Sequence, residues 1–73
     1  MQAIPALTKA NCAPYIVALI NAGGTPMYVS RYEHATDYEG EIVACLEWTA
    51  AHTLLATLRA SANGTEVFDI CEA

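Results

Sequence analysis

The stretch over residues 49–62 constrains the fold most, because it carries a single apolar stripe with helical spacing. Residues three and four apart share one face of an α-helix, so the spacing predicts an amphipathic helix with Thr49 as N-cap and Asn63-Gly64 at its end. A helix with one apolar stripe packs on one layer, and a sheet is the layer that the other segments of this chain predict. The stripe is Ala51, Leu54, Leu55, Leu58 and Ala62.

Two apolar stretches on either side of an Ala-Gly-Gly-Thr turn predict a β-hairpin over residues 15–33. Residues 15–21 read YIVALIN and residues 26–33 read PMYVSRYE, and both are rich in β-branched or aromatic side chains. Successive side chains of a strand point to opposite faces, so the second stretch places two alternating sets on the two faces of the sheet. One set is Tyr28, Ser30 and Tyr32, and the other is Met27, Val29 and Arg31.

These elements predict one small α+β domain over residues 1–73, with an antiparallel sheet of three or four strands and one helix on one face. The order is β-β-(β)-α-β, where residues 65–71 form the last strand and EIVACLEW is either a short strand or an irregular core segment. Pro5 and Pro14 predict an arm or a short turn for residues 1–13. Unless that arm covers it, the second sheet face stays open to a partner.

The charge pattern excludes direct nucleic-acid binding and favours a basic protein partner. The net charge is −5, and the three basic residues, Lys9, Arg31 and Arg59, lie far apart in the sequence. Binding to phosphates needs clustered cations, whereas an acidic surface suits a basic one. Apolar residues make up 55% of the chain and charged ones 15%, so we expect exposed apolar surface and either a homodimer or a tight complex with a host protein.

The cysteines and the apolar segments indicate a cytoplasmic protein without a membrane span. Cys12, Cys45 and Cys71 are odd in number and form no CxxC pair, which is typical of reduced thiols rather than of a secreted disulfide framework. The N-terminus lacks the basic and apolar regions of a signal peptide, and YIVALI is too short to cross a bilayer.

The stretch RYEHATDYEGE, residues 31–41, is the candidate functional region. It matches no metal motif such as HExxH or an EF-hand, so we expect a solvated or partner-facing loop; the alternative is a ligand- or metal-binding site on its His and acidic side chains, which are His34, Asp37, Glu39 and Glu41. No catalytic constellation or cofactor motif appears, so we expect no enzyme. Aromatic rings ringed by carboxylates suit a protein contact, which we place on Tyr28, Tyr32, Glu33, Asp37 and Glu39.

The layout resembles a class of small phage proteins. Tyr15-Ile-Val, a Gly turn, Met27-Tyr-Val-Ser-Arg, an Ala-x-x-x-Trp lead into the helix and a closing Thr65-Glu-Val-Phe-Asp-Ile strand are similar to the ββαβ proteins of phages and prophages, anti-CRISPR proteins among them. The resemblance implies inhibition of a host nuclease complex by binding to its surface, in some cases by mimicking the charge of DNA. In the lead, Trp48 is either a core residue under the helix start or an interface anchor.

Overall fold

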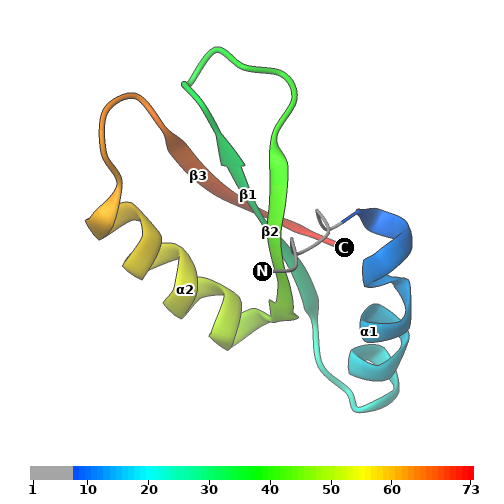
Figure 1. The fold of residues 1–73 in the computed structure, drawn as a ribbon. Helices are drawn as coiled ribbons and strands as arrows, with labels where there is room; N and C mark the ends of the chain where they lie inside the picture. Colours follow the sequence, from blue (N-terminus) through cyan, green and yellow to red (C-terminus); the bar gives the residue numbers. More distant parts are fainter. Residues whose placement is uncertain (1–7) are drawn as a thin grey trace, which may run out of the picture.

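The computed structural model describes residues 8–73, which form two helices and one three-stranded sheet (Figure 1). The elements are α1 (Lys9–Asn21), β1 (Pro26–Tyr32), β2 (Glu41–Glu47), α2 (Trp48–Ser61) and β3 (Val67–Glu72). The sheet is antiparallel with the order β2-β1-β3. The predicted α+β class is confirmed, but two helices are present where one was predicted.

The first described element is a helix, so the strand predicted over residues 15–21 and the hairpin predicted over residues 15–33 are wrong. Thr8 begins α1, since its Oγ1 accepts a hydrogen bond at 3.1 Å from the backbone N–H of Asn11. Residues 9–13 belong to this helix, which also corrects the predicted arm, and residues 1–7 lie outside the described part. Pro14 lies inside α1, where it removes one N–H donor without preventing the helix.

The glycines that predicted a hairpin turn end α1 instead. The N–H of Gly23 donates to the Ile20 carbonyl at 3.0 Å, and the N–H of Gly24 donates to the Leu19 carbonyl at 2.8 Å. This pair of bonds is the Schellman motif, in which the residue after the C-cap takes a left-handed conformation. Gly23 has a φ of 81°, which a residue without a side chain adopts at little cost.

The hairpin of this protein joins β1 to β2 through the loop of residues 33–40. EIVACLE forms a strand, one of the two possibilities that the sequence left open. β1 is the central strand: Tyr28 lies opposite Cys45 of β2 on one side and opposite Cys71 of β3 on the other. The β1–β2 register shifts between Val29 and Ser30, where a bulge adds local twist.

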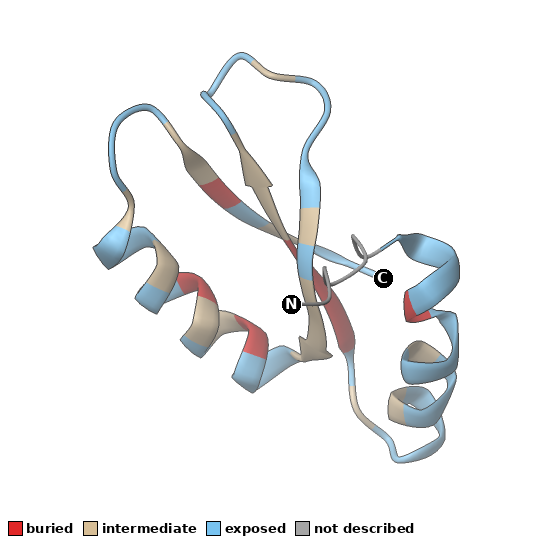
Figure 2. Ribbon diagram, in the orientation of Figure 1, coloured by how far each residue is buried: buried red, intermediate tan, exposed pale blue. Residues whose placement is uncertain are grey.

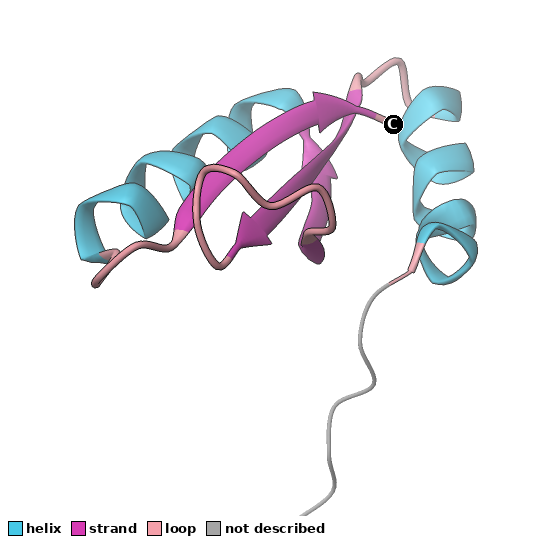
Figure 3. Ribbon diagram, turned by 90° about the horizontal axis from the view of Figure 1, so that it is seen from above, coloured by secondary structure: helices cyan, strands magenta, loops and turns pink. Residues whose placement is uncertain are grey.

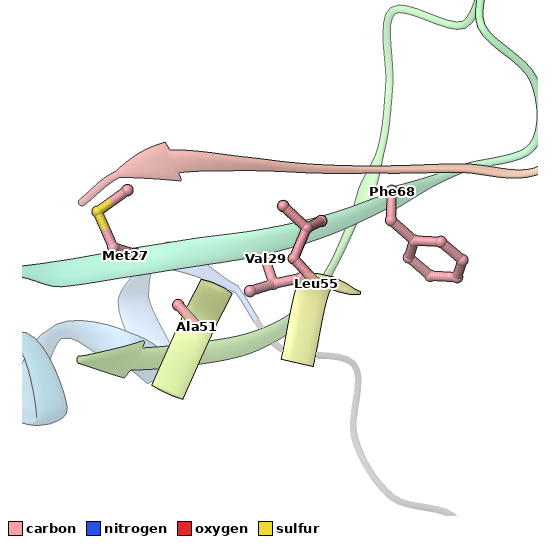
Figure 4. Packing of buried hydrophobic residues seen from close by; sticks show 5 residues of the cluster. All are labelled: Met27, Val29, Ala51, Leu55 and Phe68. Carbon is pink, nitrogen blue, oxygen red and sulfur yellow. The ribbon is translucent and has the colours of Figure 1, made fainter. Parts of the chain in front are cut away.

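The core lies between α2 and one face of the sheet (Figure 4). Met27 and Val29 of β1 and Phe68 of β3 pack against Ala51 and Leu55 of α2, and Val29 and Ala51 are fully buried. The alternation predicted for β1 is confirmed on this face. The helix predicted over residues 49–62 is also confirmed, displaced by one residue at each end.

The start of α2 differs from the prediction. Glu47 is the N-cap, because its carboxylate accepts a hydrogen bond at 2.9 Å from the Thr49 N–H. Trp48 is the first helical residue and is 49% exposed, so it is not a core residue. Its ring lies 3.9 Å from the ring of His52, one turn along the same helix. At the other end Gly64, with a φ of 65°, belongs to the turn that follows α2.

The second face of the sheet is covered by α1 over part of its area (Figure 3). Figure 2 shows buried segments, in red, on α1 as well as on the sheet and α2. Within the described residues Cys12 is the buried residue of α1, and Tyr28 beneath it is only 7% exposed. The outer flank of α1 leaves apolar side chains in solvent: Tyr15, Val17 and Ile20 are 69%, 57% and 58% exposed.

Two side chains form hydrogen bonds with backbone groups of β3. The Arg59 guanidinium donates two hydrogen bonds, at 3.2 and 3.1 Å, to the Phe68 carbonyl. The backbone N–H of Ile70 donates to Oδ1 of Asp69 at 2.8 Å. Arg59 thereby connects α2 directly to the strand on which it packs.

Candidate functional site

The acidic loop, residues 33–40, is folded around the Asp37 carboxylate. Its Oδ2 accepts a hydrogen bond at 3.1 Å from the Glu33 N–H, and its Oδ1 lies 3.2 Å from Nε2 of His34. The Asp37 N–H donates to the His34 carbonyl at 3.0 Å, and His34 Nδ1 lies 2.8 Å from the Thr36 hydroxyl. Asp37 thus has a structural role that its place in an acidic stretch did not indicate.

A second set of contacts ties the loop to the turn before β3. The Thr65 hydroxyl donates to the Glu33 carbonyl at 2.8 Å, and Arg31 pairs with Glu66 at 2.8 Å. The other oxygen of Glu66 accepts the Asn63 N–H at 3.1 Å. This backbone bond, and then the guanidinium of Arg31, hold the pKa of Glu66 below its ordinary value.

The Tyr32 ring lies directly against Gly40 at the far end of the loop. A Cβ added to Gly40 would stand 2.6 Å from Cε1 and 2.8 Å from Cζ of Tyr32. Gly40 does not have a positive φ, so the absence of a side chain, rather than backbone freedom, is what this position requires. The pair holds the two ends of the loop together and sets the position of the ring.

Beside this ring lies the loop groove, a shallow depression of about 340 Å³ between the acidic loop and β3. Two tyrosine rings and two carboxylates contribute to its walls. Tyr32 pairs with Val67 and Ser30 pairs with Asp69, so the groove lies on the same sheet face as Tyr28 and α1. The acidic loop is at the end of the sheet that α1 leaves uncovered (Figure 1). Its lining residues are Tyr32, Ala35, Asp37, Tyr38, Val67 and Asp69.

The structure brings together some of the predicted contact residues and separates others. Tyr32 and Asp37 line the loop groove, while Glu33 and Glu39 are exposed on the acidic loop beside it. Tyr28 is a correction: it lies under α1 and offers no ring to a partner, because the helix predicted as a strand covers it.

Sequence reasoning missed four members of the loop groove, which are Ala35, Tyr38, Val67 and Asp69. Tyr38 is 100% exposed, and its position in a loop, where no strand can bury it, was the available signal. Val67 and Asp69 come from β3, and the β1–β3 register that places them beside Tyr32 cannot be read from the separate segments.

The acidic loop does not assemble the alternative metal site. His34 and Asp37 meet, but within residues 8–73 no group of three or more His, Cys, Asp or Glu side chains is placed to hold an ion. Within residues 8–73 Glu33, Glu39 and Glu41 form no close ion pair, although Glu33 and Glu41 lie within electrostatic reach of Arg31, which is paired with Glu66. The loop end of the molecule therefore carries more acidic than basic side chains.

The comparisons with known proteins leave the function to be argued from this geometry. No protein family, no curated protein and no solved structure matches the chain. The order of elements, αββαβ, also differs from the ββαβ layout that the resemblance to phage proteins used. Neither α1 nor α2 has the length and apolar content needed to span a bilayer.

Proposed function

We propose that this protein is a non-enzymatic binding module that takes a cationic side chain of a basic partner protein into the loop groove. The observation that carries the proposal is the pairing of Tyr32 and Tyr38 with the carboxylates of Asp37 and Asp69 around one depression. A cation over an aromatic face gains about 0.5–1 kcal/mol at an exposed site. Arginine fits best, because its planar guanidinium both stacks on a ring and donates to carboxylates.

The charge around the loop groove supports the same partner. Glu33 and Glu39 are exposed on the acidic loop beside it, and the chain carries a net charge of −5. Such a field attracts a basic surface over a distance and speeds its encounter. Following the resemblance described above, we propose a host protein complex with a basic surface as the partner, encountered in the cytoplasm and inhibited by the contact.

A peptide titration followed by NMR tests the groove. We expect a short arginine-rich peptide to shift the amide signals of residues 32–38 and 67–69, and a peptide with glutamine in place of arginine to leave them unchanged. Tyr38→Ala should weaken binding by on the order of 1–2 kcal/mol. Tyr15→Ala is the matched control, since Tyr15 is 69% exposed but lies on α1. If the two variants lost equal affinity for the peptide, or if the shifted amide signals were confined to α1, the peptide would not bind in the loop groove.

The role of the charges is tested separately from that of the rings. Glu33 and Glu39 do not line the loop groove, so replacing both with Gln should slow association and leave dissociation nearly unchanged. Added salt should reproduce the loss, because exposed charges are screened beyond about 8–10 Å. Asp37 is unsuitable for this test, because it holds the loop. Association rates that respond to neither change would contradict electrostatic attraction.

The flank of α1 favours a homodimer as a second candidate function. This helix exposes Tyr15, Val17 and Ile20, and its only charged residue is Lys9. Two copies of an acidic protein can approach there without bringing carboxylates together. Sedimentation should then show a dimer that does not dissociate in added salt, whereas the Val17→Asp variant should be a monomer. A wild-type monomer at high protein concentration would exclude this candidate.

A further inference from the structure

Three cysteines that are far apart in the sequence gather on one face of the sheet. Cys45 and Cys71 each lie directly opposite Tyr28, and directly opposed residues of antiparallel strands share a face. Cys12 reaches the same face from α1, where it is 2% exposed. Burial raises the pKa of Tyr28, and the neighbouring thiols of all three cysteines raise it further.

Cys12 and Cys45 are the pair in contact. Both line the thiol groove, an apolar depression of about 290 Å³ between α1 and β2, together with Asn11, Tyr15, Ala44 and Leu46. Burial raises the pKa of the Cys45 thiol, and the adjacent Cys12 thiol, which is hydrogen-bonded to it, adds to the shift. All three cysteines are free thiols in this structure.

The geometry of the sheet excludes the other pairing within it. Cys45 and Cys71 lie on the two strands that flank β1, so two strand spacings, about 9.6 Å, separate their backbones. A disulfide needs Cα atoms within about 7 Å, so these two cannot be joined without moving a strand. Any intramolecular disulfide must therefore include Cys12, and the shared groove selects Cys45 as its partner.

We propose that Cys12 and Cys45 are a modification site: under oxidation by a low-molecular-weight disulfide they form a reversible bridge that fastens α1 to β2. The bridge would close a loop of roughly thirty residues and hold α1, which covers Tyr28, in place. This inference is independent of the loop groove, which involves neither cysteine.

The chemistry is a thiol–disulfide exchange in two steps. The thiolate of Cys45, which is the less buried of the pair, attacks one sulfur of the small disulfide; that S–S bond breaks and releases one small thiol, leaving a mixed disulfide. The Cys12 thiolate then attacks the Cys45 sulfur, forms the protein bridge and releases the second small thiol. The protein loses two protons and two electrons, and the small disulfide is reduced to two thiols. Because the thiolate is the nucleophile and the pKa of Cys45 is raised, little thiolate is present at neutral pH, and the reaction becomes faster as pH rises.

Mass spectrometry of the Cys71→Ser variant after incubation with oxidised glutathione tests the proposal. This variant removes the exposed cysteine, which would otherwise react independently. We expect the intact mass to fall by about 2 Da, and mapping to show a peptide that joins positions 12 and 45. The melting temperature should rise by on the order of 10 °C and return to its first value after reduction.

Matched single variants complete the test in the wild-type chain. Cys12→Ser and Cys45→Ser should each lose the bridge, and the Cys45 thiol of the former should instead retain one glutathione. Two free thiols in oxidised Cys71→Ser, or only a glutathione adduct there, would overturn the proposal. A bridge from Cys12 to Cys71 in the wild-type chain would overturn it equally.

Discussion

Gly40 and Tyr32 offer a decisive test of how the acidic loop is built. Gly40→Ala places a methyl group 2.6 Å from the Tyr32 ring, whereas ordinary contacts begin at about 3.4 Å. The ring must therefore retreat by roughly 1 Å. Overpacking costs about 1–3 kcal/mol, and the half-exposed ring can move, so the lower end applies.

The same substitution carries an opposite effect through the unfolded chain. Alanine has fewer backbone conformations than glycine and stabilises by about 0.4–1 kcal/mol where the native backbone allows it, as the φ of Gly40 does. In the wild type the two effects leave a net loss of roughly 0.5 kcal/mol. In a Tyr32→Ala background the clash is gone, so Gly40→Ala should stabilise by about 0.5 kcal/mol. The predicted signature is a change of sign.

Chemical denaturation of the wild type, the two single variants and the double variant measures this change of sign. We expect a coupling free energy of about 1 kcal/mol between positions 32 and 40. Gly64→Ala is the control: Gly64 has a φ of 65° and open space around it, so its cost lies in the backbone and should be equal in both backgrounds. If Gly40→Ala changed stability by the same amount and sign with and without the Tyr32 ring, the contact would not restrain the loop.

Three further predictions follow from the core and from the titrating groups. Leu55→Ala, at a side chain that is 6% exposed, should cost about 2–5 kcal/mol in denaturant unfolding, a large part of the roughly 4–11 kcal/mol expected for a chain of this length; an effect below 1 kcal/mol would contradict the core assignment. The lowered pKa of Glu66 stabilises the fold above its ordinary value of 4.5, and this contribution is lost as pH falls through the folded value, so the free energy of unfolding should decline in acid more steeply for wild type than for Glu66→Gln. The raised pKa of Tyr28 contributes stability that is present below its ordinary value of 10 and is lost as pH rises through the folded value. Tyrosinate absorbance should therefore show a component that titrates above 10 and that Tyr28→Phe removes.

The elements that could be predicted are those whose periodicity is unambiguous. The stripe of α2 and the alternation of β1 each fit one structure, and both faces of β1 are oriented as the pattern requires. Local contacts decide such segments, because the spacing of apolar residues states directly which side is buried. The end of α2 could be predicted for the same reason, to within one residue.

The first helix could not be predicted by the same reasoning, because YIVALIN is apolar on all sides. A short apolar run without periodicity fits a buried strand and a helix equally, and β-branched residues with Pro14 favoured the strand. The caps carried the correct information: Thr8 three residues before Asn11, and Gly23-Gly24 after Asn21. The glycine pair fits both a hairpin and a Schellman motif, and only the tertiary structure distinguishes them.

The loop groove includes two of the five residues that the sequence placed at the partner contact. Tyr32 was identified from its face of the predicted strand beside the acidic stretch, and Asp37 from the stretch itself, so both came from one continuous segment. Tyr28 was assigned to the site because α1 was missed, and Asp69 was overlooked because it reaches the groove through strand pairing. Contacts that depend on register between distant segments lie beyond the reach of local pattern.

The contacts of β3 have a consequence for solubility. The backbone N–H of Ala73 donates to Pro26, and antiparallel pairing alternates from there, so the polar groups of Phe68 and Ile70 point away from β1. An edge strand with unpaired groups can recruit a strand from another molecule and start a fibril. Here Arg59 occupies the carbonyl of Phe68, and Asp69 occupies the N–H of Ile70. Two ordinary surface charges thus block part of this edge and hinder the addition of a further strand to β3.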